Sequence, residues 1–541
     1  MVNLSSGLVS AVVAAFAVAY VLEGRGGVNQ RRIQQVVPFL LWGAAAMVVV
    51  WARWPTIVMQ ASLNPDEAQF IADAIKVSDG YWMPWADVDT YTVGPLLSFV
   101  LAPFVMVASS APYLAARIVI IACGIGWTAG SFLALRILVS ASLARLLAVP
   151  MLLVLALPGA TDTFSLSSEY LPVALLILGA GLAMSGVASD SYGAWKTLGG
   201  FMLIGLVPYA KTQLIPVAVV LAIALCMSGL ITRRLNPKKT AESILALSAP
   251  SLAIGVLVVV FPAIRDGLVR NFLFFRSYAS GEVFQKLPAG EILRVLSDGL
   301  LKPIGGVFVV MTVIVIVLLV FSHRGRDSRS VMALSTVAVA PIGVWSMVYP
   351  GFGFYHYVWV GLIPLLFSVC VLVAWLAARC PLLNREGLLG GVFALAMIFS
   401  ACLASFVVGN PTTGRDINPE FSWRHLGTLG SGEQLAVKGK LDSCSGQIAV
   451  WGWDAGIFVV SNKPHFSPWS TLLSPEDVGA RQWMDEVLES KPECIVDATG
   501  PGQFVFTNPQ SQLRSQPRAS GLLASYNLVL SSANYRVYRN H

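Results

Sequence analysis

Residues 213–231 read QLIPVAVVLAIALCMSGLI and contain no charged side chain. A run of about 17–25 apolar residues is long enough to cross a bilayer as one helix. The chain repeats this pattern along most of its length: 56% of its 541 residues are hydrophobic and only 12% are charged. Because a soluble domain carries about 25% charged residues, the composition excludes a water-soluble globule and predicts an α-helical polytopic membrane protein.

The apolar runs predict about twelve transmembrane helices. We expect them at 5–22, 35–58, 113–135, 146–160, 170–187, 198–210, 213–231, 243–262, 303–321, 330–348, 357–377 and 388–408. The short apolar stretch 94–104 contains Pro103 and predicts an interfacial helix instead of a span. Lys and Arg cluster in short loops that share one side when the spans alternate, and the positive-inside rule makes that side cytoplasmic. The net charge of +7 therefore reflects topology and predicts no nucleic-acid partner.

Three longer segments fall on the opposite, extracytoplasmic side. They are residues 59–112, residues 263–302 and residues 410–541. The chain is therefore expected to consist of a membrane body, residues 1–409, and a small polar module, residues 410–541.

The polar module has the pattern of an α/β domain. Residues 447–453, 494–497, 527–530 and 535–538 resemble strands, and residues 475–490 begin with the acids and proline typical of a helix start. In this module, Cys444 and Cys494 could pair if it lies in an oxidising compartment, and the sequence leaves that pairing open. The remaining cysteines show no metal-ligand spacing, so no metal site is predicted from them.

Two adjacent carboxylates stand out in the first outer segment. Asp66 and Glu67 directly follow Asn64-Pro65, a pair that favours a helix start. Acids in a first turn can simply stabilise the helix dipole. Alternatively, a carboxylate in a partly desolvated cleft can act as a general base and take a proton from a substrate hydroxyl.

The residues around this pair resemble a known family. Residues 64–70 (NPDEAQF), 80–82 (GYW) and 92–96 (TVGPL) are similar to the first extracytoplasmic loop of polytopic GT-C glycosyltransferases, in the family 39-like branch with protein O-mannosyltransferases and aminoarabinose transferases. Further short similarities lie at 205–213 (GLVPYAKTQ), 355–357 (YHY), 450–454 (VWGWD) and 535–538 (YRVY). The chain departs from the commoner layout because an apolar segment, residues 5–22, precedes the helix before the Asp-Glu loop. This leaves the helix count and the side of the N-terminus open.

The resemblance implies a GT-C fold and a glycosyltransferase of glycan biosynthesis in the cell envelope, integral to a plasma membrane such as a bacterial inner membrane. Such an enzyme moves a hexosyl or pentosyl group from a polyprenyl-phosphate sugar, with inversion, to a glycan, lipid or protein acceptor on the extracytoplasmic face. Asp66 matches the family's general base, with Glu67 beside it. A divalent cation that bridges Asp66 and the donor phosphate stays open as a cofactor.

The donor phosphate needs cations. Lys211 lies at membrane depth, where a charge indicates function, although a lysine at a helix end can also snorkel to the surface. Arg265, Arg270 and Arg276 lie on the outer side, against the positive-inside bias. They are expected to bind the donor phosphate or anionic lipid headgroups.

The remaining expected site residues are polar or aromatic side chains at outer helix ends. The predicted substrate-binding residues are Gln213, Tyr355, His356, Tyr357 and Glu169. The aromatic members could instead form part of an interfacial aromatic belt.

Two other functions compete with this interpretation. A polysaccharide polymerase or ligase also uses lipid-linked glycans at the outer face, but relies more on arginines than on an early Asp-Glu pair. A lipid or solute transporter is favoured by inverted repeats and broken, charged helices in mid-membrane, and the sequence shows neither pattern.

Overall fold

The computed structural model describes most of the chain. The described residues are 56–156, 164–189, 193–280, 286–296, 335–379, 430–472, 478–501 and 509–541, without 91–92 and 353 and with isolated positions at 42–54, 331–332 and 475. The predicted spans 5–22, 303–321 and 388–408, and most of 35–58, lie outside these residues.

Most of the described residues before 380 are helical. The helices are α3 (Pro65–Ser78), α4 (Leu96–Val107), α5 (Pro112–Leu135), α6 (Ala141–Leu153), α7 (Tyr170–Ala188), α8 (Ala194–Leu206), α9 (Ile215–Ile231), α10 (Pro237–Val260), α11 (Pro262–Ser280), α12 (Ala289–Leu296), α15 (Val339–Val348) and α16 (Val358–Arg379). Short 3-10 helices adjoin several of them: η2 (Val154–Ala156), η4 (Val207–Tyr209), η5 (Thr212–Leu214) and η7 (Tyr355–Tyr357).

Among the described residues, five helical segments are long and apolar enough to cross a membrane. They are Pro112–Leu135, Tyr170–Ala188, Thr212–Ile231, Pro237–Val260 and Tyr355–Ala378. They match the spans predicted at 113–135, 170–187, 213–231, 243–262 and 357–377. The other described apolar helices are shorter; among them Leu96–Val107 agrees with the interfacial helix expected at 94–104.

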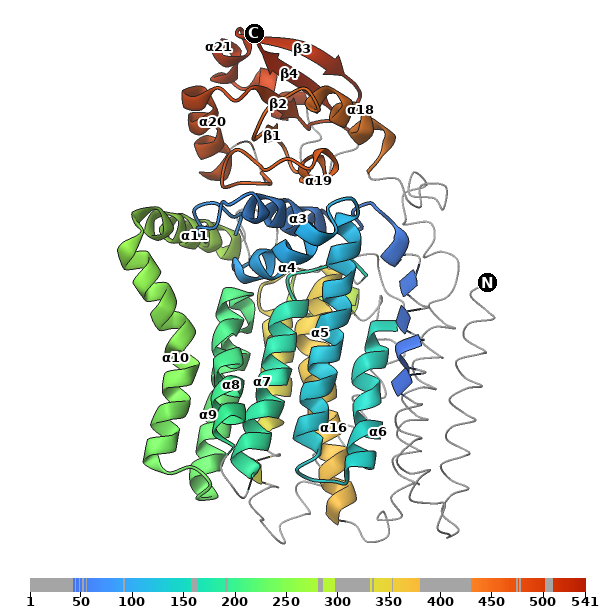
Figure 1. Ribbon diagram of the computed structural model, residues 1–541, viewed down its shortest axis with the longest axis vertical. Coiled ribbons are helices and arrows are strands. Elements are labelled where there is room, and N and C mark those ends of the chain that lie inside the picture. Colours follow the sequence, from blue (N-terminus) through green and yellow to red (C-terminus); the bar gives the residue numbers. More distant parts are fainter. Residues whose placement is uncertain are drawn as a thin grey trace.

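The long helices pack side by side into one bundle (Figure 1). Glycine permits close packing of α5 against α7, because a Cβ on Gly130 would lie 2.3 Å from the Ile177 carbonyl oxygen. The rings of Trp127, Tyr170 and Trp359 stack between α5, α7 and α16, with centroids 5.3–6.3 Å apart. By contrast, only 6% of the apolar part of α10 is buried against the rest of the protein. This helix therefore lies at the margin of the bundle.

Helices α3, α4 and α11 lie across one end of the bundle, which we call the α3 end (Figure 1). Buried α3 side chains such as Phe70 and Ile71 pack in the same core as Leu97 and Leu101 of α4. Helix α11 follows α10 after a single residue, Phe261, whose extended backbone ends α10. Through α3 and α4, the described part of residues 59–112 therefore lies across the ends of the long helices.

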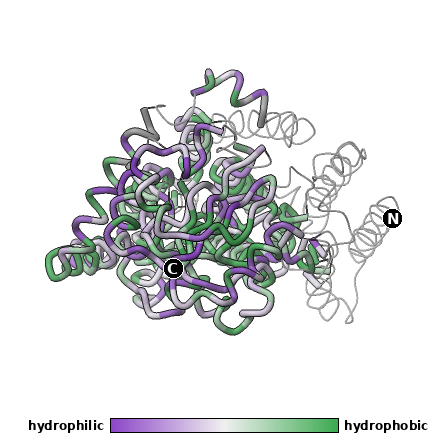
Figure 2. The backbone as a smooth tube through the Cα atoms, turned by 90° about the horizontal axis from the view of Figure 1, so that it is seen from above, coloured by the Kyte–Doolittle hydropathy of each residue, from purple (hydrophilic) through white to green (hydrophobic). Residues whose placement is uncertain are grey.

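The C-terminal module covers the α3 end (Figure 1). Its helices are α18 (Gly432–Leu441), α19 (Gly456–Ser461), α20 (Val478–Ser490) and α21 (Ala519–Leu523), with 3-10 turns η11 (Pro509–Ser511) and η12 (Leu513–Ser515). Its strands are β1 (Ala449–Trp451), β2 (Cys494–Asp497), β3 (Tyr526–Ser531) and β4 (Arg536–Asn540). Seen from above, hydrophilic segments of this module overlie hydrophobic helices (Figure 2).

The four strands form one mixed sheet in the order β1-β2-β4-β3. Strands β1 and β2 are parallel, whereas β4 runs antiparallel to both β2 and β3. The strands lie where the sequence predicts them, and β2 coincides with residues 494–497 because four consecutive buried residues fill the middle of the sheet. Cys444 and Cys494 form a disulfide that ties the segment after α18 to β2.

Candidate active site

The start of α3 places two carboxylates in different environments. The Asn64 side chain caps the helix by accepting a hydrogen bond of 2.8 Å from the Asp66 backbone N–H, and Pro65 occupies the first helical turn. The Asp66 side chain keeps 28% of its surface exposed, whereas Glu67 is completely buried. Only Asp66 is therefore positioned to meet a substrate.

Glu67 is enclosed in an ion pair. Its Oε2 atom lies 2.5 Å from Arg117 Nη2, and its Oε1 accepts a hydrogen bond of 2.9 Å from the Leu166 N–H. Burial raises the pKa of Glu67 despite the opposing charge of Arg117. Arg117 also donates to the carbonyls of Thr56, Met59 and Ala61. Glu67 and Arg117 thus tie the chain before α3 to α5, an arrangement that favours a supporting role for Glu67 over direct action.

Asp66 faces the start of α16. Its Oδ2 atom lies 3.9 Å from His356 Nε2, and the His356 side chain is only 6% exposed. Stacking on Phe354, with ring centroids 5.6 Å apart, and an edge contact with Tyr357 at 5.0 Å hold the imidazole in place. At 3.9 Å the two groups are too far apart for a hydrogen bond, but the imidazole is near enough to act on the carboxylate electrostatically, and the two could hold one divalent cation together.

Lys211 and Glu169 form the next part of the cluster. Lys211 Nζ lies 3.0 Å from Glu169 Oε1, donates to Ser168 Oγ at 2.7 Å and sits 5.2 Å from the Tyr357 ring centroid. Both side chains are almost wholly buried, where an unpaired charge would be costly, and each serves as the counter-ion of the other. Through Tyr357 and His356, this pair adjoins Asp66.

A close backbone crossing brings the first outer segment to Lys211. The Gly94 N–H donates to the Ala210 carbonyl at 3.1 Å, and a Cβ on Gly94 would lie 1.9 Å from the Tyr209 carbonyl oxygen. Any side chain at this position would push the two segments apart. The packing of these two segments thus requires a glycine at position 94 in the TVGPL stretch, which the sequence alone did not reveal.

The other predicted residues divide into two groups. Gln213 donates a hydrogen bond of 2.6 Å to the Ser346 carbonyl and so links η5 to α15, while Tyr355 is half-buried beside His356. The three arginines lie on α11: Arg265 is exposed and pairs with Asp266, and Arg276 is exposed. Arg270 is half-buried, and among the described residues its buried Nε atom has no hydrogen-bond partner.

Comparison with known proteins identifies the fold. No family model matches the sequence, and no curated protein matches it. The structure is similar to ArnT from Cupriavidus metallidurans bound to undecaprenyl phosphate, with a TM-score of 0.52 and 13% identity over 95% of this chain and 99% of that one. It is also similar to the oligosaccharyltransferase AglB from Archaeoglobus fulgidus in complex with an inhibitory peptide and a dolichol-phosphate, with a TM-score of 0.51 and 10% identity over 94% of this chain and 75% of that one. The chain has the same fold as these two proteins.

Within this fold, sequence reasoning overlooked Arg117. The residue lies inside the span predicted at 113–135, and a charge within an apolar helix is itself a signal of a built-in role. Its partner Glu67 was assigned to the catalytic pair, and the ion pair between them depends on how α3 packs against α5.

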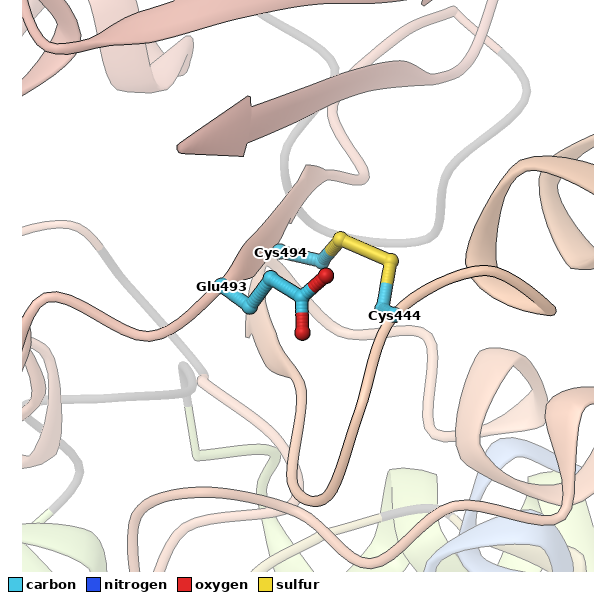
Figure 3. A group of neighbouring side chains, drawn as sticks. All are labelled: Cys444, Glu493 and Cys494. Atoms are coloured by element: carbon cyan, nitrogen blue, oxygen red, sulfur yellow. A yellow bond between two sulfur atoms is a disulfide. The ribbon is translucent and has the colours of Figure 1, made fainter. Parts of the chain in front are cut away.

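A second cluster has the composition of a metal site but not its chemistry. The ligand atoms of Cys444, Glu493 and Cys494 lie within 4.8 Å of one another (Figure 3). The two sulfur atoms are bonded to each other and offer no thiolate. The Glu493 Oε2 atom instead accepts two hydrogen bonds of 2.6 Å, from the backbone N–H and the hydroxyl of Ser445. We therefore assign this group a structural role.

Proposed function

We propose that this GT-C protein transfers a sugar from a polyprenyl-phosphate donor to an acceptor hydroxyl at the α3 end of the bundle. The observation that carries the proposal is the cluster of Asp66, His356, Tyr357, Lys211 and Glu169. It joins α3, α7, α16 and the chain before η5 around one partly exposed carboxylate. The lipids named with ArnT and AglB support a polyprenyl-phosphate carrier.

Asp66 is the general base in this mechanism. The acceptor hydroxyl attacks the anomeric carbon and loses its proton to the Asp66 carboxylate, while the bond from that carbon to the phosphate oxygen breaks. The polyprenyl phosphate leaves as a stable anion, so one base is sufficient and no general acid is required. Attack opposite the leaving group inverts the anomeric centre through an oxocarbenium-like transition state. His356 is close enough to orient Asp66 and to stabilise its charge.

Arg270 and Lys211 are the proposed phosphate partners. Arg270 offers a half-buried guanidinium whose Nε atom lacks a partner among the described residues, and a phosphate oxygen would satisfy it. Lys211 already has Glu169 as its counter-ion, so it contributes by polarising the cluster unless the donor displaces that contact. The exposed Arg265 and Arg276 are better placed for lipid headgroups, and His356 and Tyr355 for the sugar.

The proposed reaction takes place outside the cytoplasm. Arg233 and Arg234 lie in the α9–α10 connection, and Lys238 and Lys239 lie in the first turn of α10, at the opposite end of this helix from α11. The positive-inside rule favours a cytoplasmic side for that end, and this supports an outer position for the α3 end and the C-terminal module. The Cys444–Cys494 disulfide fits the same orientation, because disulfides persist in oxidising compartments.

A lipid-binding and turnover assay tests the proposal. The full chain in nanodiscs is incubated with undecaprenyl phosphate and, separately, with a panel of radiolabelled polyprenyl-phosphate and polyprenyl-diphosphate sugars, with and without EDTA. We expect saturable binding of undecaprenyl phosphate that Arg270→Gln weakens and Arg276→Gln leaves nearly unchanged, together with consumption of a monophosphate donor. Consumption of diphosphate donors alone would favour a polymerase or ligase, and transport into liposomes without turnover would contradict the proposal.

A further inference from the structure

The C-terminal module contacts α3 through a cluster of buried polar residues, separate from the proposed catalytic residues. We call it the α3 node: Asp73 and Lys76 of α3, Asp89 of the first outer segment, and His465, Ser467, Ser470 and Thr471 of the module. Every member is at most 2% exposed. Burying polar side chains is costly unless they are paired, so an interface of this composition specifies one arrangement of its partners.

One half of the α3 node centres on His465. Its Nε2 atom lies 3.0 Å from Asp73 Oδ1, and its Nδ1 atom lies 3.4 Å from Lys76 Nζ. Lys76 also donates to the Ser467 carbonyl at 3.0 Å. Burial lowers the pKa of His465 well below its usual value and raises that of Asp73 well above its own. Both shifts favour an uncharged imidazole on His465 beside a protonated carboxyl on Asp73.

The other half centres on Asp89. A single oxygen, Oδ2, accepts four hydrogen bonds of 3.0–3.1 Å, from the backbone N–H and the hydroxyl of both Ser470 and Thr471. The Asp89 N–H in turn donates to Asp73 Oδ1 at 3.2 Å. The two halves thus share Asp73, and a shift of the module would strain both.

His465 belongs to the rigid part of the module. It pairs with Ile448, next to β1, as an isolated parallel bridge, flanked by hydrogen bonds from Ile448 to Pro464 and from Phe466 to Ile448. Its ring also meets Phe458 of α19 edge-on, with centroids 5.6 Å apart. The imidazole is therefore held by the sheet and presented to α3 in a fixed orientation.

The geometry of α3 connects the α3 node to Asp66. Residues seven apart on an α-helix are separated by about two turns, roughly 10 Å, and lie on nearly the same side. Asp66 and Asp73 have this spacing. A roll or tilt of α3 that removed Asp66 from His356 would therefore also pull Asp73 from His465.

We propose that His465 is a positioning residue: through Asp73 and Lys76, the C-terminal module fixes α3 so that Asp66 stays beside His356. This inference rests on the proposed function for its effect on catalysis, but not for its effect on α3. It gives the module a role in holding the catalytic helix, besides any contact with the acceptor.

Hydrogen exchange and a double-mutant cycle test this proposal. The full chain in nanodiscs is compared as wild type, His465→Ala, His465→Gln and His541→Ala, the last being an exposed histidine of the same module. We expect His465→Ala to speed amide exchange about tenfold or more over residues 65–70, which precede Asp73 on α3, while exchange in α5 and β2 stays unchanged. His465→Gln should recover part of the protection, and His541→Ala should match the wild type.

Turnover separates positioning from general destabilisation. With the polyprenyl-phosphate sugar that the wild type consumes, His465→Ala should lower kcat by roughly tenfold to a hundredfold, with little change in KM. In an Asp66→Asn background it should add no further loss, because its effect acts through Asp66. Multiplicative losses, or unchanged exchange over 65–70, would overturn the proposal. If the wild type consumes no donor, the proposed function fails, and the hydrogen-exchange experiment alone tests the positioning role of His465. If His465→Ala does not fold, Thr471→Val replaces it in both experiments.

Discussion

The Nε2 atom of His356 lies 3.9 Å from the Oδ2 atom of Asp66, although the two residues belong to distant parts of the sequence. Asp66 begins α3, and His356 lies in the 3-10 turn that leads into α16. The contact thus joins the layer across the α3 end to one of the long helices beneath it.

Breaking the Glu67–Arg117 ion pair should unfold the α3 end more readily. Glu67→Gln leaves a buried guanidinium without its counter-charge, which typically costs about 3–5 kcal/mol. The measurement is thermal or denaturant unfolding of the protein in detergent. Asp266→Asn, which breaks an exposed pair with Arg265, is the matched control and should change stability by less than about 1 kcal/mol. Equal effects of the two substitutions would contradict the buried role of Glu67.

The Lys211–Glu169 pair distinguishes structure from catalysis. Lys211→Met should abolish most transfer, whether the lysine polarises the cluster or only neutralises Glu169. The double variant Lys211→Met with Glu169→Gln removes both buried charges and should restore folding stability, because no uncompensated ion remains. If the lysine's charge serves the reaction, transfer stays low in the double variant. Recovery of transfer along with stability would show that the pair is structural.

The disulfide should stabilise the C-terminal module. Cys444 and Cys494 are 50 residues apart. Closing a loop of this length lowers the entropy of the unfolded chain and thereby stabilises the folded state by about 4 kcal/mol. Cys444→Ser with Cys494→Ser should therefore make residues 430–541 much more sensitive to protease under mild denaturation. Cys226→Ser, which changes a free cysteine, serves as the control and should leave the digestion rate unchanged.

Asp497 should make the module less stable as the pH rises. Burial raises the pKa of this carboxyl to about 6, although Thr499, Arg536 and the Leu513 N–H stabilise its charged form. The folded state therefore binds the proton more tightly than the unfolded state, whose carboxyl has a pKa of about 3.9. Its contribution is complete below about pH 4 and is lost as the pH rises to about 6, by roughly 3 kcal/mol.

The urea midpoint for protease resistance of the module, measured between pH 4 and 7, tests this dependence. Asp497→Asn cannot ionise and should flatten the fall across that window. An equally steep fall in the variant would assign the pH dependence to other groups.

Much of the fold could be predicted because apolar periodicity and length are local signals. The span at 170–187 differs from α7 by one residue, and β2 coincides with its prediction. The span expected at 146–160 corresponds instead to α6 and η2, Ala141–Ala156, because a charged residue such as Arg145 inside the helix does not mark its end. Hydropathy alone places helix boundaries poorly where charges lie within the first turns.

The site was predictable by residue type but not by pairing. Asp66, His356 and Lys211 could be named from the sequence because polar residues are conspicuous between apolar runs. That Glu67 pairs with Arg117, that Lys211 pairs with Glu169, and that Asp73 meets His465 depend on how distant helices pack, and no local pattern encodes those distances. The division of the three α11 arginines into one half-buried and two exposed residues was equally out of reach of the sequence.

The most direct measurement is the rate of sugar transfer by Asp66→Asn in the full chain. The substitution keeps the size of the side chain and removes its basicity, so the rate should fall by about 10²–10⁴-fold while undecaprenyl phosphate still binds. Asp79→Asn, at the exposed other end of α3, is the matched control and should transfer at the wild-type rate. A folded Asp66→Asn protein that transfers sugar as fast as the wild type would contradict the assignment of Asp66 as the base.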